Sequence, residues 1–168
     1  MRHHWIMSSL LLVSCASSGA ETSGSMQTPL RGELNAALVQ AELFGAELDL
    51  AQHLEEGQHV ALVFWQSWCA SCVKEAPAIQ QASERYGEQI KFVGVISGPD
   101  SSVDELHLSE TIDRLGLDYT QVRDRELNLT RLFDVQATPT LVVLDPNGDV
   151  AYRGHAPPQS WDALLGRS

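Results

Sequence analysis

Blocks of apolar and polar residues alternate along most of the chain, and their spacing changes between two periods. Residues 60–65 form a continuous apolar run that predicts a buried strand, and residues 91–96 predict the next strand. Residues 71–86 and 103–115 predict helices, and Gly116 is expected to end the second of them. Strands therefore alternate with helices through the middle of the chain.

The C-terminal third adds shorter elements. Four apolar residues at helical spacing predict a short helix, namely Leu127, Leu129, Leu132 and Phe133. Residues 140–144 and 150–153 lie on either side of a Pro-Asn-Gly turn and predict a hairpin. Residues 160–166 predict a terminal helix that has its own cap and stop.

An N-terminal hairpin is predicted by residues 34–43 and 46–50, which are separated at Gly45, and residues 51–56 predict one or two helical turns. Strands that alternate with helices and then close with a hairpin and a helix indicate an α/β fold with a central mixed sheet flanked by helices. A folded part of about 140 residues suits one domain with a single core.

The first 15 residues have the features of an export segment. A weakly basic start precedes the apolar residues 5–13, which are far fewer than the ~20 needed to span a bilayer. The segment ends at Cys15 and resembles a bacterial lipoprotein signal, in which the new N-terminal cysteine is acylated. An ordinary secretory signal or an accidental apolar start is the alternative. We therefore expect a signal at 1–14, a lipidated cysteine and flexible tether at 15–28, and the folded domain at 29–168.

The net charge of the chain excludes some classes of binding partner. It has 22 acidic and 11 basic residues and a formal net charge of −11. Such a surface repels nucleic acid and anionic lipid headgroups, so a lipid on Cys15, and not charge, would hold the protein at a membrane. Export also places the two other cysteines where thiols tend to be oxidised.

Those two cysteines, Cys69 and Cys72, lie at the junction between the predicted strand 60–65 and the helix that follows. A cysteine at a helix N-terminus faces unpaired backbone N–H groups, which favour its thiolate, and a second thiol three residues later can resolve what the first attacks. The inner face of the helix is predicted to carry Cys72, Ala76, Ile79 and Ser83. A zinc site is the other interpretation, but it needs a second ligand pair, and the histidines have no paired spacing.

The segments FWQSWCASC, VKEAP and ATPTLVVLDPNGDVAYRG resemble the thioredoxin superfamily, and more narrowly its TlpA/ResA-like extracytoplasmic thiol–disulfide oxidoreductases. The resemblance covers residues 34–166. It implies that Cys69 attacks, that Cys72 resolves, and that Thr138-Pro139 carries a cis proline opposite the disulfide. It further implies a monomeric, membrane-anchored reductase without cofactor or metal. Its expected partners are disulfides of envelope proteins, as in cytochrome c or oxidase maturation, and a membrane electron donor.

Three residues are candidates for substrate binding. A cis bond before Pro139 would turn the chain sharply and expose the Thr138 backbone to an extended substrate. The residues alone allow an ordinary trans proline at a strand start equally well, and the resemblance favours cis. Trp68, beside the thiols, is expected to be a contact surface for protein partners.

Glu75 is the candidate proton acceptor. It lies three residues after Cys72 and therefore on the same helix face, where a carboxylate could take the proton of Cys72 as that thiol attacks. It matches the active-site glutamate of the ResA-like branch, whereas Val63 stands where cytoplasmic thioredoxins have a buried acid. The alternative is a glutamate that merely complements the helix dipole.

The direction of electron transfer and two alternative functions remain open at the level of sequence. Ala70-Ser71 replaces the family's common proline-containing dipeptide, which helps to set the reduction potential, so the direction of electron flow is open. A peroxiredoxin-like peroxidase would need Pro and Thr or Ser where this chain has Leu62 and Gln66. The third alternative is a non-catalytic binding module or metallochaperone on the same fold. His155 is considered separately as a metal ligand with the two cysteines.

Overall fold

The computed structural model of the chain describes Glu33 and residues 50–167. The predicted signal, Cys15, the tether and the hairpin segment up to residue 49 lie outside these residues. The last residue of that predicted hairpin, Leu50, is helical instead, because helix α2 spans Leu50–Glu55. The helical turns predicted at 51–56 are thereby confirmed.

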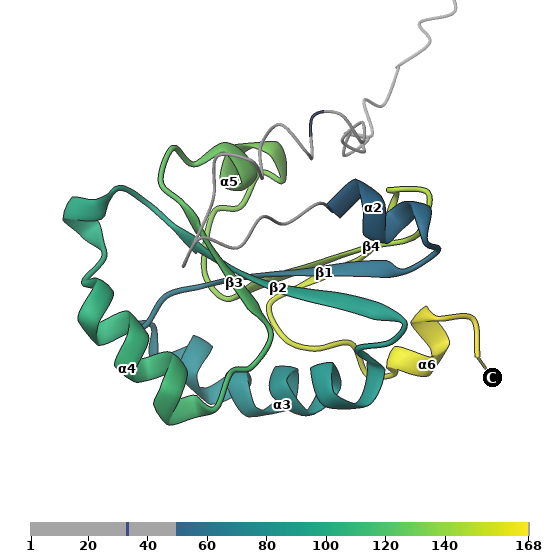
Figure 1. Cartoon of the computed structure of the whole chain (residues 1–168), viewed down its shortest axis with the longest axis horizontal. Helices are drawn as coiled ribbons and strands as arrows, with labels where there is room; N and C mark the ends of the chain where they lie inside the picture. The colour runs from purple at the N-terminus through teal and green to yellow at the C-terminus, as the bar shows by residue number, and fades with distance from the viewer. Residues whose placement is uncertain (1–32, 34–49, 168) are drawn as a thin grey trace, which may run out of the picture.

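A five-stranded mixed sheet forms the centre of the described domain, in the order β3-β2-β1-β4-β5 (Figure 1). Its strands are β1 (His59–Trp65), β2 (Ile90–Ser97), β3 (Thr120–Asp124), β4 (Thr140–Leu144) and β5 (Val150–Gly154). β1 and β3 run parallel to β2, whereas β4 runs antiparallel to both β1 and β5. The mixed sheet and four of its strands agree with the sequence pattern.

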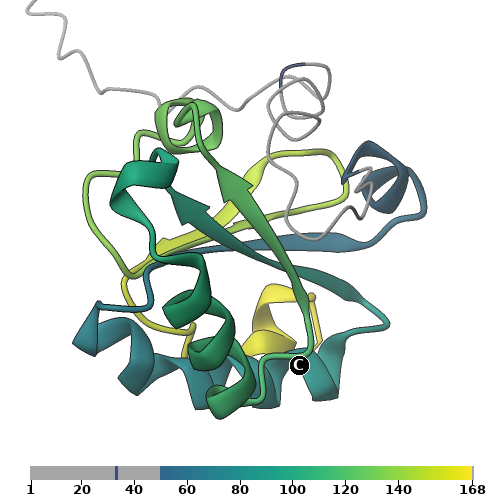
Figure 2. The same cartoon turned by 60° about the vertical axis from the view of Figure 1, so that its left-hand side comes forward.

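Helices cover both faces of this sheet (Figures 1 and 2). One face carries α3 (Ala70–Tyr86), α4 (Glu105–Leu115) and α6 (Trp161–Leu164), and the other carries α2 and α5 (Asn128–Leu132). Leu62 and Phe64 of β1 belong to the core on the second face, and Ala61 and Val63 to the core on the first. Burial on both faces explains why β1 is a continuous apolar run. Within the described residues, no helix is long and apolar enough to cross a membrane.

Strand β3 was not predicted, because its sequence TQVRD contains a single apolar residue, Val122. The strand forms through its parallel pairing with β2, and Gln121 shows how a polar side chain is accommodated there. Its Oε1 accepts the indole N–H of Trp65 at 3.0 Å, and its Nε2 donates to the Tyr119 carbonyl at 3.2 Å. A buried polar group with its partners made carries little penalty, so tertiary pairing overrides the local pattern.

Helix α4 begins two residues later than the pattern predicts. Asp104 is its N-cap, and the carboxylate accepts the backbone N–H of His107 at 3.0 Å, so the first helical residue is Glu105. The helix ends as predicted at Gly116, which has φ of 61°. This left-handed conformation is one that glycine adopts without a Cβ penalty.

The inner face of α3 also differs slightly from its prediction. Cys72, Ala76 and Ile79 are buried as expected, but Ser83 is only half-buried. Ala82 and Tyr86 bury the second half of the helix instead. The buried stripe therefore runs from the two cysteines along the whole helix and fixes α3 against the sheet.

Candidate active site

The two cysteines lie where β1 ends and α3 begins, as the sequence predicts. Cys69 is the N-cap of α3 in an extended backbone conformation, and it forms a disulfide with Cys72 across a Cα–Cα distance of 5.2 Å. The short connection from β1 is tied down, because the Cys69 N–H donates to the Gln66 carbonyl and the Gln66 amide donates to the Ser97 carbonyl of β2. The end of the central strand thus places the first sulfur at the helix N-terminus.

Two hydrogen-bond donors surround the Cys69 sulfur. The backbone N–H of Cys72 donates to it at 3.2 Å, and the Ser71 hydroxyl oxygen lies 3.3 Å away. Cys69 is only 7% exposed, so water competes little with these donors. In the reduced protein the same two donors and the helix N-terminus would stabilise a thiolate at this atom.

The Thr138–Pro139 segment lies opposite the disulfide. The peptide bond between these residues is cis, in agreement with the resemblance. The Thr138 carbonyl oxygen is 3.6 Å from the Cys69 sulfur, and both Thr138 and Pro139 are half-buried. This segment, between α5 and β4, therefore borders the first sulfur directly.

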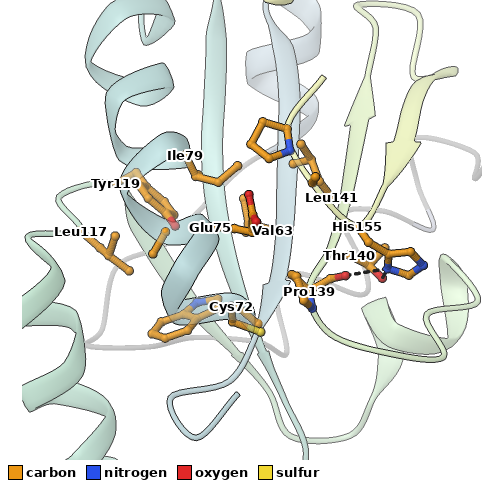
Figure 3. A pocket seen from close by; sticks show the side chains of 14 residues that line it. Val63, Cys72, Glu75, Ile79, Leu117, Tyr119, Pro139, Thr140, Leu141 and His155 are labelled. Atoms are coloured by element: carbon orange, nitrogen blue, oxygen red, sulfur yellow. Dashed lines mark hydrogen bonds between the residues drawn. The ribbon is translucent and has the colours of Figure 1, made fainter. Parts of the chain in front are cut away.

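A small pocket opens behind the second sulfur (Figure 3). Its walls include Cys72, Ile79, Leu141 and Pro139, and the Glu75 side chain points into it. No hydrogen bond or ion pair engages the Glu75 carboxylate within the described part of the chain. The cavity has a volume of about 20 Å³, which is room for roughly one water molecule and not for a substrate side chain. A partly enclosed carboxylate beside Cys72 can accept a proton from that thiol.

Tyr119 and Leu117 form the wall of this pocket on the side away from His155. Burial raises the pKa of the Tyr119 phenol, which keeps it protonated and neutral beside the site. The sequence did not indicate either residue, because both belong to the connection into the unpredicted strand β3. Trp68 lies outside the pocket and is 69% exposed, which makes it an accessible apolar surface next to the disulfide.

The residues considered for other chemistries have different surroundings. Leu62 is fully buried in the core, and the Gln66 side chain is engaged with Ser97. His155 bonds through Nδ1 to the Pro139 carbonyl at 2.8 Å. Across residues 50–167 and Glu33, no three histidine, cysteine or acidic side chains come together to hold a metal ion.

Comparison with known families decides the relationship. The Redoxin family matches residues 31–163 of the chain. The chain belongs to the Redoxin family. Among curated proteins, the thiol-disulfide oxidoreductase ResA of Halalkalibacterium halodurans is 28% identical over 120 residues, which cover 71% of this chain and 65% of the relative. ResA of Geobacillus kaustophilus is 31% identical over 113 residues, covering 67% and 62%. The chain thus spans less than two thirds of the length of these relatives.

Solved structures show the same fold. A secreted Mycobacterium tuberculosis disulfide oxidoreductase, homologous to E. coli DsbE, superposes with a TM-score of 0.58 and 26% identity over 73% of this chain and 87% of that one. StoA from Bacillus subtilis superposes with a TM-score of 0.55 and 24% identity over 65% and 81%. The thioredoxin-like fold and the resemblance to the ResA-like branch of the thioredoxin superfamily are thereby confirmed.

Proposed function

We propose that this Redoxin-family chain is an extracytoplasmic thiol–disulfide oxidoreductase that exchanges disulfides with other proteins through Cys69 and Cys72. The observation that carries the proposal is the position of the Cys69 sulfur. It receives the Cys72 N–H at the N-terminus of α3 and lies 3.6 Å from the Thr138 carbonyl. This arrangement joins an activated nucleophile to a backbone edge that an extended substrate can pair with.

The reaction is written in the reducing direction. The Cys69 thiolate attacks one sulfur of a substrate disulfide, forms a mixed disulfide and releases the first substrate thiolate. Cys72 then loses its proton to Glu75 and attacks the Cys69 sulfur, so the Cys69–Cys72 disulfide forms and the second substrate thiolate leaves. Two electrons pass to the substrate, and a membrane electron-donor protein restores the dithiol.

The surface of the site supports a protein as the substrate. The pocket of about 20 Å³ has room for roughly one water molecule, which supports a substrate that lies across the site and not inside it. The exposed Trp68 indole and the Thr138 backbone offer an apolar contact and a pairing edge, which suit a protein segment. Envelope proteins that must be kept reduced, such as apocytochrome c or oxidase assembly factors, are the proposed substrates.

Disulfide exchange with a protein tests the assignment. The chain without residues 1–28 should reduce the disulfides of insulin when a dithiol is supplied. Cys69→Ser should abolish this activity, because the thiol that remains, Cys72, is 4% exposed and is not the N-cap of α3. Retained activity in Cys69→Ser would refute the assignment. A peroxide turnover faster than protein-disulfide exchange would favour the peroxidase alternative.

Anchoring by a lipid on Cys15 completes the proposal. Several acyl chains hold a protein at a membrane stably, and the small polar residues 16–28 would serve as the tether between the anchor and the domain. Cys15→Ser should leave insulin reduction intact while it releases the protein from the membrane fraction or blocks its processing. Fractionation after labelling with a radioactive fatty acid measures this. A wild-type chain that is unlabelled and fully soluble would contradict the anchor.

A further inference from the structure

We propose that His155 is a positioning residue whose Nδ1–H holds the Pro139 carbonyl and so keeps the Thr138 backbone in register with a bound protein substrate. The inference rests on the proposed function and adds to it a residue that distinguishes protein disulfides from small ones. It concerns binding geometry and leaves the redox chemistry of the two cysteines unchanged.

The position of His155 follows from the strand pairing. β4 and β5 are antiparallel with Leu141 opposite Gly154, so the next residue, His155, comes opposite Thr140. Its Nδ1 lies 2.8 Å from the Pro139 carbonyl oxygen and 3.5 Å from the Thr140 hydroxyl oxygen. A carbonyl oxygen only accepts hydrogen bonds, so Nδ1 carries the proton. Figure 3 shows the imidazole beside Pro139 and Thr140, on the side of the pocket away from Tyr119.

The C-terminal end of β5 also contacts the segment that leads from α5 to Pro139. Arg153 lies in β5 two residues before His155, and its guanidinium donates to the backbone carbonyls of Phe133 and Asp134. The Thr140 hydroxyl closes the loop internally by donating to the Ala137 carbonyl at 2.7 Å. Residues 133–140, which we name the proline loop, are therefore held near the start by Arg153 of β5 and near the end by His155, which directly follows β5.

Through the proline loop, His155 controls the distance between the Thr138 backbone and the Cys69 sulfur. The Thr138 carbonyl is 3.6 Å from the Cys69 sulfur, so a shift of the loop changes the distance between a paired substrate and the attacking atom. Misplacement by about 1 Å costs up to ~100-fold in rate when geometry sets the reaction. A small disulfide that makes no backbone pairs with Thr138 does not depend on this register.

Substitutions that distinguish the loss of the Nδ1–H donor from the loss of the imidazole ring test the proposal. His155→Ala removes the donor, whereas His155→Asn retains an N–H at about the distance of Nδ1 and His155→Gln moves it outward. His107→Ala, an exposed histidine on α4 away from the proline loop, is the matched control. The full chain would be assayed with insulin and with 5,5′-dithiobis(2-nitrobenzoic acid), and its reduction potential measured against glutathione.

We expect His155→Ala to lower kcat/KM for insulin about tenfold, mainly through kcat, because the loss of one hydrogen bond lets the proline loop misalign a paired substrate with the Cys69 sulfur. The rate with the small disulfide should stay within about twofold of wild type. The reduction potential should be unchanged. His155→Asn should recover most of the insulin activity, and His107→Ala should match wild type. If His155→Ala fails to fold in melting curves, the difference between the Asn and Gln variants carries the same test.

The outcomes separate the two levels of inference. Equal rates for wild type and His155→Ala on both substrates would overturn the positioning role while leaving the oxidoreductase assignment intact. Equal losses on both substrates, or a shifted reduction potential, would also overturn it, because the residue would then act on the thiols or on stability. A wild-type chain that does not reduce insulin at all would reject the proposed function and this inference together.

Discussion

Helices α3 and α5 both begin just beyond the C-terminal end of a parallel strand, and both direct backbone N–H groups at a side chain of the preceding segment. At α5 that side chain is Asp124, which is 2% exposed and accepts the Leu129 N–H, the Thr130 N–H and the Thr130 hydroxyl. At α3 that side chain is Cys69, whose sulfur accepts the backbone N–H of Cys72 and the hydroxyl of Ser71.

The difference between the two helix ends lies in the acceptor atom and in its access. The Asp124 carboxylate accepts from three donors within 3.2 Å and is enclosed by the core, so solvent and other molecules have little access to it. The Cys69 sulfur has two donors beyond 3.1 Å and is a weaker acceptor, and it borders the proline loop, where we propose that a substrate binds. The same helix electrostatics therefore produces a fixed structural cap in one place and a reactive group in the other.

Removal of the Asp124 carboxylate should break the structural end of this comparison. Asp124→Ala leaves the N–H groups of Leu129 and Thr130 without partners in a largely buried setting, and we expect a loss of about 3 kcal/mol in the free energy of unfolding. Urea denaturation of the oxidised protein, followed by circular dichroism, measures this. Insulin reduction below the transition should persist, since the thiols belong to another helix end.

The control for this variant is Asp113→Asn, an exposed carboxylate on α4. It should change the free energy of unfolding by less than about 0.5 kcal/mol. If Asp124→Ala were as stable as this control, the hydrogen bonds at the start of α5 would contribute nothing net, and the contrast with α3 would lose its physical basis.

Glu75→Gln tests the reactive end of the comparison. Loss of a positioned general base typically slows the assisted step ~100-fold, and Glu75 shares a pocket with Cys72 and not with the Cys69 sulfur. The attack of Cys72 on the mixed disulfide should therefore slow much more than the first attack by Cys69. Stopped-flow reduction of a defined disulfide with rapid acid quench separates the two phases.

Glu84→Gln, further along α3, is the matched control and should leave both phases unchanged. Wild-type rates in both phases of Glu75→Gln would reduce Glu75 to a residue that complements the helix dipole. Equal slowing of both phases would place its effect on the stability of the thiolate at Cys69 instead.

The reactive helix end could be predicted from sequence because all its parts are local. Strand, motif and helix follow one another directly, so the position of Cys69 as a helix cap and the burial of Cys72 needed no tertiary information. Glu75 follows from helix spacing in the same way. The cis form of Thr138–Pro139 required the family resemblance, since the residues alone allowed either isomer.

The structural helix end could not be predicted in this way. Asp124 ends a strand with a single apolar residue, and the strand exists only because it pairs with β2. Its carboxylate reaches Leu129 and Thr130 across a turn at Leu127, which adopts a left-handed conformation that no local signal indicates. His155 likewise was considered only as a metal ligand, because its contact with Pro139 arises from the register of β4 and β5.

Ser71→Ala sharpens the comparison with the smallest expected change, because it removes one of the two donors at the Cys69 sulfur and leaves the backbone donor in place. A hydrogen bond that stabilises the thiolate favours the reduced protein, so its loss should make the protein more reducing. A loss of ~1.4 kcal/mol corresponds to about 30 mV for this two-electron couple. The rate of attack by Cys69 should fall about threefold. This is less than the fall in the thiolate population, because the thiolate that remains is more nucleophilic.

Equilibration with glutathione measures the potential, and alkylation of Cys69 by iodoacetamide as a function of pH measures the thiolate. Ser67→Ala is a suitable control, since Ser67 precedes the motif and is buried away from solvent. A potential that moves upward in Ser71→Ala would show that the hydroxyl favours the disulfide. In that case the number of donors at the sulfur would not explain why one helix end reacts and the other does not. A downward shift with nearly unchanged stability would show that a single hydroxyl tunes the reactive end without taking part in the fold.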